Sequence, residues 1–107
     1  MSDYLTFATD ASTFEEIKKN IELLASTELC EYESGWWGIY AQGKSHLANE
    51  IKLYPNYVEG EGYHEKDKNI SYLLSFSMAT DVEKIKEIVS KSMFSFKLIR
   101  HETLKST

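Results

Sequence analysis

The sequence contains one cysteine, one arginine and no apolar run that approaches the length of a membrane span. The single cysteine, Cys30, excludes an internal disulfide, which is typical of proteins from a reducing compartment. The first ten residues, MSDYLTFATD, lack a basic segment followed by an apolar core, so they do not resemble a secretion signal. These absences predict a cytoplasmic protein with no membrane partner.

Basic residues are also scarce. The chain has 12 lysines and arginines against 17 aspartates and glutamates, which gives a formal net charge of −5. Residues 1–35 alone contain eight acids and two bases, a net of −6. A nucleic-acid-binding surface needs clustered lysine and arginine, so a direct nucleic-acid partner is not expected. Complementary charge favours a basic protein as the partner, although acidic residues also serve ordinary solubility.

The remaining composition suits one folded domain over residues 1–107. A chain of 107 residues with 42% hydrophobic and 13% aromatic residues can fill a core, and no linker, repeat or low-complexity block divides it. Two stretches have the apolar spacing of amphipathic helices, with stripes at Phe14, Ile17, Ile21, Leu24 and Ala25, and at Val82, Ile85, Ile88 and Val89. Ser12, Thr13 and Thr80 each precede a glutamate by three residues, which predicts a capping box at both helix starts.

Alternating residues predict strands at 4–9, 70–78 and 93–101, each with one apolar and one polar face. Residues 29–42 alternate with one change of parity at Ser34 and Gly35, which predicts a single strand with a glycine bulge. Such a bulge would turn Trp37, Ile39 and Ala41 into the core and leave Trp36 and Tyr40 facing outward. A turn at Gly43 and Lys44 would follow, and residues 57–64 are either another strand or part of a long loop.

The order of these elements is strand, helix, two or three strands, strand, helix, strand. It predicts an α+β fold in which two helices pack on one face of a mostly antiparallel five- or six-stranded sheet. This arrangement is an elaborated split β-α-β fold.

Residues Gly38–Ser45 match the phosphate-loop pattern G-x-x-x-x-G-K-[ST] at every fixed position. A phosphate loop follows a buried parallel strand and opens a helix, whereas this segment follows the acidic stretch CEYESGWW and itself alternates like a strand. The context therefore favours a strand with a hairpin turn. A nucleotide-binding loop is kept as a third functional hypothesis.

Catalytic signatures are absent from the sequence. The three histidines are not spaced as metal ligands, the stretch His64–Asp67 looks like a charged tip, and no serine lies in a nucleophile-elbow pattern. We therefore expect neither enzymatic activity nor a metal or other cofactor.

The stretch NYVEGEGYHE combines aromatic rings with carboxylates. If it is extended, Tyr57, Glu59, Glu61 and Tyr63 share one face, which is typical of a protein-binding surface. The alternative is a solvated loop. Trp36 and Tyr40 would form a second exposed aromatic pair, unless the 54–69 segment or a neighbouring strand covers Trp36.

A small, acidic α+β domain with these features resembles the bacterial immunity proteins of contact-dependent inhibition systems, which neutralise a toxin domain. The resemblance implies a cognate toxin, often a basic nuclease, as the partner of a monomer or homodimer. It implies that Glu31, Glu33, Glu59 and Glu61 meet toxin lysines and arginines, and that Trp36, Tyr40, Tyr57 and Tyr63 supply buried anchors. The alternative is a regulatory domain that binds a small molecule and forms a dimer.

Overall fold

The computed structural model describes residues 2–104 and contains two helices and eight strands in that range. In chain order these are β1 (Ser2–Thr9), α1 (Phe14–Ala25), β2 (Cys30–Ser34), β3 (Gly38–Ser45), β4 (Ala48–Pro55), β5 (Tyr57–Val58), β6 (Gly62–Tyr63), β7 (Tyr72–Ala79), α2 (Val82–Ser90) and β8 (Lys97–Leu104). Neither helix is long and apolar enough to cross a membrane.

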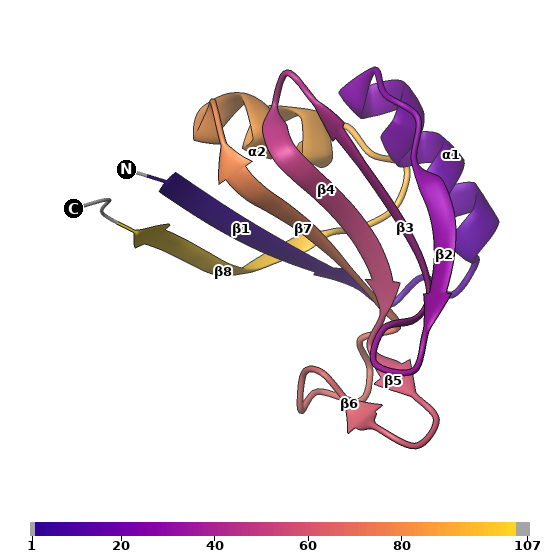
Figure 1. Ribbon diagram of the computed structural model, residues 1–107. Helices are drawn as coiled ribbons and strands as arrows, with labels where there is room; N and C mark the ends of the chain where they lie inside the picture. Colours follow the sequence, from indigo (N-terminus) through magenta and orange to yellow (C-terminus); the bar gives the residue numbers. More distant parts are fainter. Residues whose placement is uncertain (1, 105–107) are drawn as a thin grey trace.

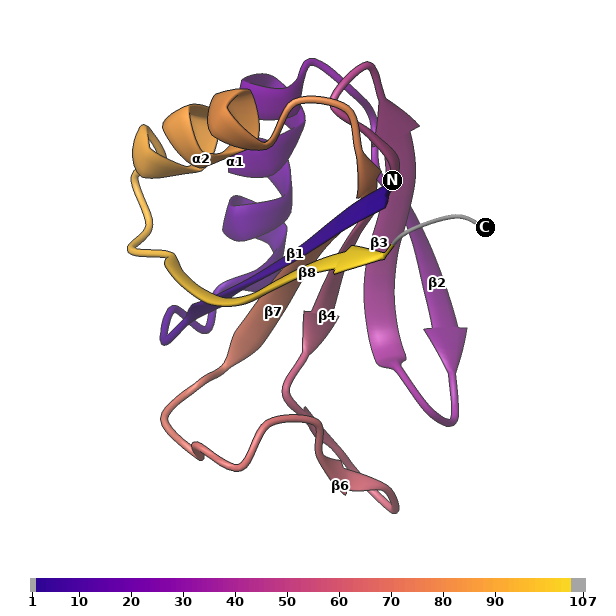
Figure 2. The ribbon, with the colours of Figure 1, turned by 90° about the vertical axis from the view of Figure 1, so that its left-hand side faces the viewer.

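Six strands form one antiparallel sheet in the order β2-β3-β4-β7-β1-β8. Both helices cover one face of it, and the opposite face is open (Figures 1 and 2). Strands β4, β7, β1 and β8 with the two helices make the split β-α-β core, because β7 lies between β1 and β4. The predicted α+β fold with two helices on an antiparallel sheet is confirmed, with six strands.

The core lies between the helices and the sheet. Alternate residues of the central strands point toward the helices, and the two predicted helical stripes face them. Its buried members include Leu5, Phe7, Ile17, Ile21, Ile51, Leu53, Leu74, Phe76, Ile85 and Val89.

The predicted single strand with a bulge over residues 29–42 is wrong. Residues 30–34 and 38–45 are two strands, joined by the three-residue turn Gly35–Trp37, and Ser34 pairs with Gly38. The Ser34 hydroxyl accepts a hydrogen bond of 2.9 Å from the Trp37 amide, and Gly38 has the positive φ of 71° that this turn requires. The parity of the residues changes at a hairpin, not at a bulge. Ile39 and Ala41 share one face of β3, but Ala41 is in the helix-side core, whereas Ile39, next to the hairpin turn, is 57% exposed.

The predicted turn at Gly43 and Lys44 is also displaced. The chain reverses at His46 and Leu47, and Gly43 lies within β3 beneath the segment that follows α1. A Cβ atom at Gly43 would lie 2.5 Å from the Glu28 carbonyl oxygen, so close backbone approach explains this glycine. Because Gly38–Ser45 is a strand followed by β4, its backbone does not form a phosphate loop opening a helix.

Both predicted capping boxes are absent. Thr13 makes no side-chain cap bond, and the N-cap of α2 is Asp81, whose carboxylate accepts from the Lys84 amide at 3.1 Å. The last strand begins at Lys97 rather than at residue 93, although Phe94 and Phe96 still pack against the core.

Candidate protein-docking surface

The turn between β2 and β3 and the β5–β6 hairpin meet at one end of the sheet (Figure 1). We call this region, residues 35–37 and 57–63, the docking end. The two parts are in contact, because the Trp36 ring lies 5.4 Å from the ring of His64, which directly follows β6. A Cβ at Gly38 would come within 3.3 Å of Pro55 Cγ, so the strands behind them are also closely packed.

Asn56 holds the segment that carries the β5–β6 hairpin. Its side chain is completely buried, and its Oδ1 accepts from the Glu65 amide at 2.7 Å. Its amide nitrogen donates to the carbonyl oxygens of Glu65, Asp67 and Ile70 at 3.1–3.3 Å. A backbone bond of 3.0 Å from Asn56 to the carbonyl of Ser71 closes the segment at its base. The side-chain amide of Asn56 is buried and all its polar atoms have partners, so it fixes the position of residues 57–70.

His64 lies inside an aromatic box on the open face of the sheet. Its ring centroid is 5.3–5.4 Å from those of Trp36, Trp37 and Tyr54, and its buried Nε2 has no hydrogen-bond partner within residues 2–104. Burial disfavours the imidazolium and lowers the pKa of His64, while nearby Glu65, Glu61 and a bond to the Trp36 backbone oppose this shift. His64 thus supports Trp36 as a neutral aromatic ring. It is not part of the charged tip that the sequence suggested.

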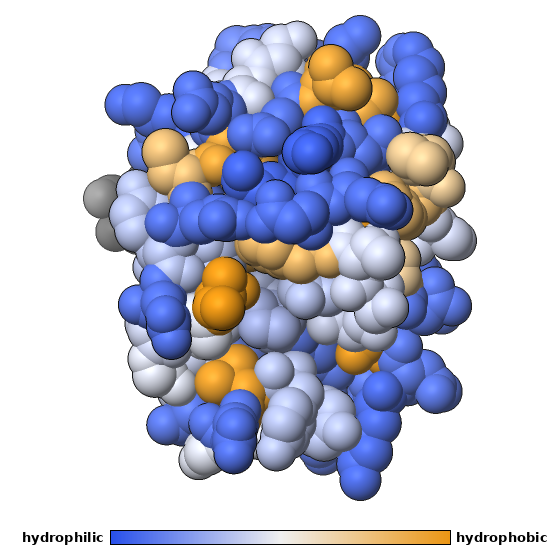
Figure 3. Space-filling view, turned by 90° about the vertical axis from the view of Figure 1, so that its right-hand side faces the viewer, coloured by the Kyte–Doolittle hydropathy of each residue, from blue (hydrophilic) through white to orange (hydrophobic). Residues whose placement is uncertain are grey.

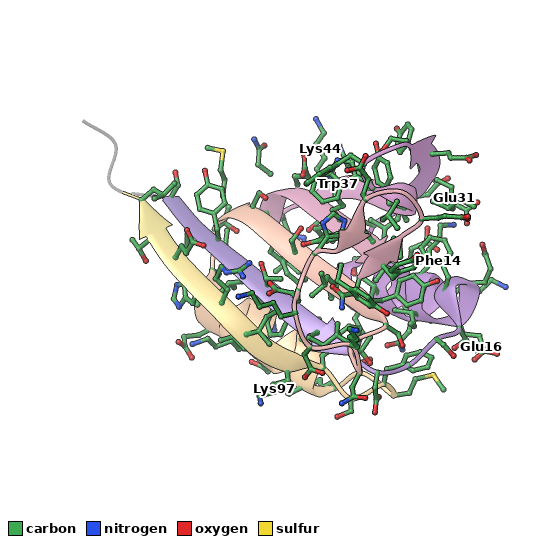
Figure 4. All side chains as sticks on the ribbon, turned by 90° about the horizontal axis from the view of Figure 1, so that it is seen from below. Phe14, Glu16, Glu31, Trp37, Lys44 and Lys97 are labelled. Carbon is green, nitrogen blue, oxygen red and sulfur yellow. The ribbon has the colours of Figure 1, made fainter. Side chains whose placement is uncertain are left out.

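The two tryptophans occupy different environments. Trp37 is half-buried, 4.9 Å from the Tyr54 ring, and the Lys52 ammonium lies 4.0 Å over its centroid. Trp36 is 54% exposed and touches the box only through His64 and Trp37. Figure 4 shows Trp37 on the open-face side of the sheet, away from the helix side that bears Phe14 and Glu16. Trp37 therefore packs in a second, smaller core, and Trp36 is available to a partner.

Tyr57 and Tyr63 face each other across β5 and β6. Their ring centroids are 4.9 Å apart, and they are 53% and 44% exposed. Gly60 and Gly62 have φ near +90°, so the chain reverses between the tyrosines and carries Glu59 and Glu61 at an exposed tip. The four residues do not lie on one extended strand, but the hairpin still gathers two rings and two carboxylates at one place.

Tyr40 and the two β2 carboxylates lie further along the sheet. Tyr40 is half-buried between Tyr32 and Trp37, so it stabilises the open face instead of forming an exposed anchor. Glu33 is exposed at the end of β2 beside the turn. Glu31 faces the helix side, apart from Trp37 in Figure 4, and a hydrogen bond with the Glu15 carboxyl raises the pKa of Glu31, against the attraction of Lys18.

The charged residues of the two segments that form the docking end are mainly acidic. Residues 20–43 and 53–65 contain seven glutamates, four in the first segment and three in the second, and no lysine or arginine. Lys52 and Arg100 approach from neighbouring strands, but their cations already contact Glu50 and Glu65. The Lys68 ammonium lies 5.6 Å over the Tyr63 ring and is the cation that approaches the hairpin itself. Glu33, Glu59 and Glu61 make no ion pair within residues 2–104, so their charge is available to an incoming cation.

Two other site types have weaker support within residues 2–104. No group of three or more histidine, cysteine or acidic side chains could hold a metal ion there. A cavity of about 250 Å³ lies between the end of β1 and the start of β8, lined among others by Asp10, Asp67 and Lys97. Two further cavities have volumes of about 350 Å³ beside Phe94 and about 320 Å³ beside Leu23, so all three are at the lower end of the size range of small-molecule sites.

Asn56 and His64 are the two residues of this surface that the sequence did not indicate. Each is a polar residue in a polar stretch of sequence. Only the fold places Asn56 beneath the 57–70 segment and His64 beside the rings of Trp36 and Trp37. The fold and surface define an α+β domain with an acidic, aromatic docking end. Comparison with protein-family models, curated proteins and solved structures found no match to this chain.

Proposed function

We propose that this chain binds a basic protein through the docking end and inhibits it, as bacterial immunity proteins do with their toxins. The observation that carries the proposal is the exposure of Trp36, Tyr57 and Tyr63, together with Glu33, Glu59 and Glu61, on two turns at one end of the sheet. Tryptophan and tyrosine are the residue types that contribute most binding energy at interfaces.

The structure of the docking end suits tight and specific association. His64 packs against the Trp36 ring, and Asn56 anchors the segment that carries Tyr57 and Tyr63, which reduces the conformational freedom that is lost when a partner binds. The surrounding carboxylates accelerate encounter with a basic surface and disfavour acidic competitors. A toxin that acts on nucleic acid has such a basic surface, and a partner that covers it would block access of the substrate.

The direct test uses the protein encoded by the adjoining upstream reading frame as the partner. The two proteins are co-expressed and co-purified. Growth inhibition by the upstream protein is then measured with and without this chain. We expect a complex and restored growth, and both should be lost in the double variant Trp36→Ala/Tyr57→Ala. Leu23→Ala is the matched control, because Leu23 is 80% exposed but lies on α1.

Undiminished growth inhibition, or no complex, would contradict the proposal. The regulatory-domain hypothesis predicts a different result: the chain alone would form a dimer, measurable by light scattering, and Trp36→Ala would dissociate it.

A further inference from the structure

The sheet has two edge strands, β2 and β8, and they differ in the regularity of their pairing with the neighbouring strand. At the β8 edge the pairing with β1 shifts register between Thr6 and Phe7, and the strand carries Lys97 and Arg100. Bulges and basic side chains are common means by which proteins block an edge against further strands. Strand β2 pairs with β3 without any shift and contains neither lysine nor proline. The β2 edge therefore lacks the register shift and the basic side chains of β8, and its own charges are those of Glu31 and Glu33.

The β2 edge is also accessible. Cys30, Glu31, Tyr32 and Glu33 are all exposed, and no strand lies beyond them within residues 2–104. Figure 3 views the molecule from this side, where the surface is mainly hydrophilic with small, separate hydrophobic spots. An added strand would find the outward backbone groups of β2 unpaired by the sheet, and main-chain hydrogen bonds would supply affinity.

The side chains of β2 favour one kind of added strand. Glu31 and Glu33 share one face, with Glu15 of α1 beside Glu31, and Lys18 is already within 4.0 Å of Glu22. A second copy of β2 would place like charges next to one another, which is destabilising. A strand with lysine or arginine at alternate positions would instead set its cations beside both carboxylates. Charge complementarity thus selects a cationic strand over self-pairing.

We propose that the outer edge of β2 accepts an extended, lysine- or arginine-bearing strand of the partner protein as a seventh strand of the sheet. This inference rests on the proposed function and extends it, because β2 leads directly into the turn that carries Trp36. The partner strand would lie along β2, and the aromatic rings of the docking end would contact the structure next to it.

The test uses an acetylated, amidated peptide of eight residues in which lysine and valine alternate. Binding to the whole chain is followed at low ionic strength by amide hydrogen exchange. We expect slower exchange at residues 30–34 and no change along β8. A peptide with every backbone nitrogen methylated keeps the same charges but cannot pair with a strand, and it should give no protection. The double variant Glu31→Lys/Glu33→Lys should weaken binding about tenfold, as expected for two exposed ion pairs.

The matched control is Glu83→Lys/Glu102→Lys, which changes the net charge equally on α2 and β8 and should leave binding unchanged. Circular dichroism verifies that each variant is folded. Equal binding of the methylated peptide, protection of β8 instead of β2, or no binding would overturn the inference. The same exchange experiment on the complex with the upstream protein separates the two proposals. If a complex forms but β2 is not protected, only the strand addition is contradicted. If the two proteins form no complex, the proposed function is contradicted.

Discussion

The Trp36 indole packs edge-on against the imidazole of His64, with the ring centroids 5.4 Å apart and the planes at 71°. The most exposed aromatic ring of the docking end thus packs against a half-buried imidazole that can take up a proton. A proton on His64 would place a charge among three aromatic rings, on an imidazole whose Nε2 has no partner within residues 2–104.

The first prediction concerns pH. Because the pKa of His64 is lowered below its usual 6.5 in the folded protein, the unfolded chain binds more protons as the pH falls through about 6.5. His64 should therefore lower the stability below pH 6.5, and the loss should level off below its folded pKa. Melting temperatures at several pH values measure this effect. His64→Phe should remove it, whereas His46→Gln, in the exposed β3–β4 turn, should leave it in place.

The second prediction concerns the two tryptophans. Trp37→Ala should cost about 2–4 kcal/mol of unfolding free energy, since it empties the small core around Tyr54. Trp36→Ala should cost less than about 1 kcal/mol, because most of this ring is exposed. Urea unfolding of both variants tests the assignment. Equal costs would show that Trp36 is a structural residue and remove the main anchor from the proposed interface.

The third prediction concerns Asn56. Asn56→Ala removes every side-chain hydrogen bond of this buried amide and should destabilise the protein by about 2–4 kcal/mol. Limited proteolysis should then cut first within residues 57–70. Asn69→Ala, at an exposed position, serves as the control and should change neither stability nor the cleavage pattern.

The fourth prediction distinguishes two glycines. Gly43→Ala should destabilise the protein by about 1–3 kcal/mol, since its Cβ would collide with the Glu28 carbonyl and press on a Leu29 methyl group. Gly35→Ala should be close to neutral, because no atom lies within 4 Å of the added Cβ. Denaturant midpoints compare the pair. A neutral Gly43→Ala would contradict the placement of Gly43 in β3.

The fold could be predicted because the helical stripes at Ile17–Ala25 and Val82–Val89 and the alternation in β1 and β7 all report burial on one side. The course of the chain between residues 29 and 64 could not. Tyr54 is buried and Trp37 half-buried on the open face of the sheet, which the alternation predicts to be solvated, so parity alone places Trp37 in the wrong core. Gly43 looked like a turn because glycine is common in turns, and only the approach of Glu28 reveals its packing role.

The candidate surface was predicted more successfully in composition than in arrangement. Trp36, Tyr57, Tyr63, Glu59 and Glu61 are exposed as expected. The four members within residues 57–63 are brought together by a reverse turn and not by an extended strand. The sequence alone predicts the same exposure for Tyr40 and Trp36, because they are four residues apart and so share a face in an extended chain. The distinction comes from Tyr32 and Trp37, which enclose Tyr40 from two strands.

The hydrogen bond from the backbone amide of Asn56 to the Ser71 carbonyl bears on how partner specificity could diverge among related proteins. Because the two ends of the 56–71 segment are joined at the sheet, the residues between them form a closed insert whose tip does not contribute to the helix-side core. Substitutions of the exposed side chains of Tyr57, Glu59, Glu61 and Tyr63 should therefore cost little folding free energy, whereas Val58 is buried and Gly60 and Gly62 have positive φ. We expect variants of this domain that recognise different proteins to differ most in this insert and least in the sheet beneath it.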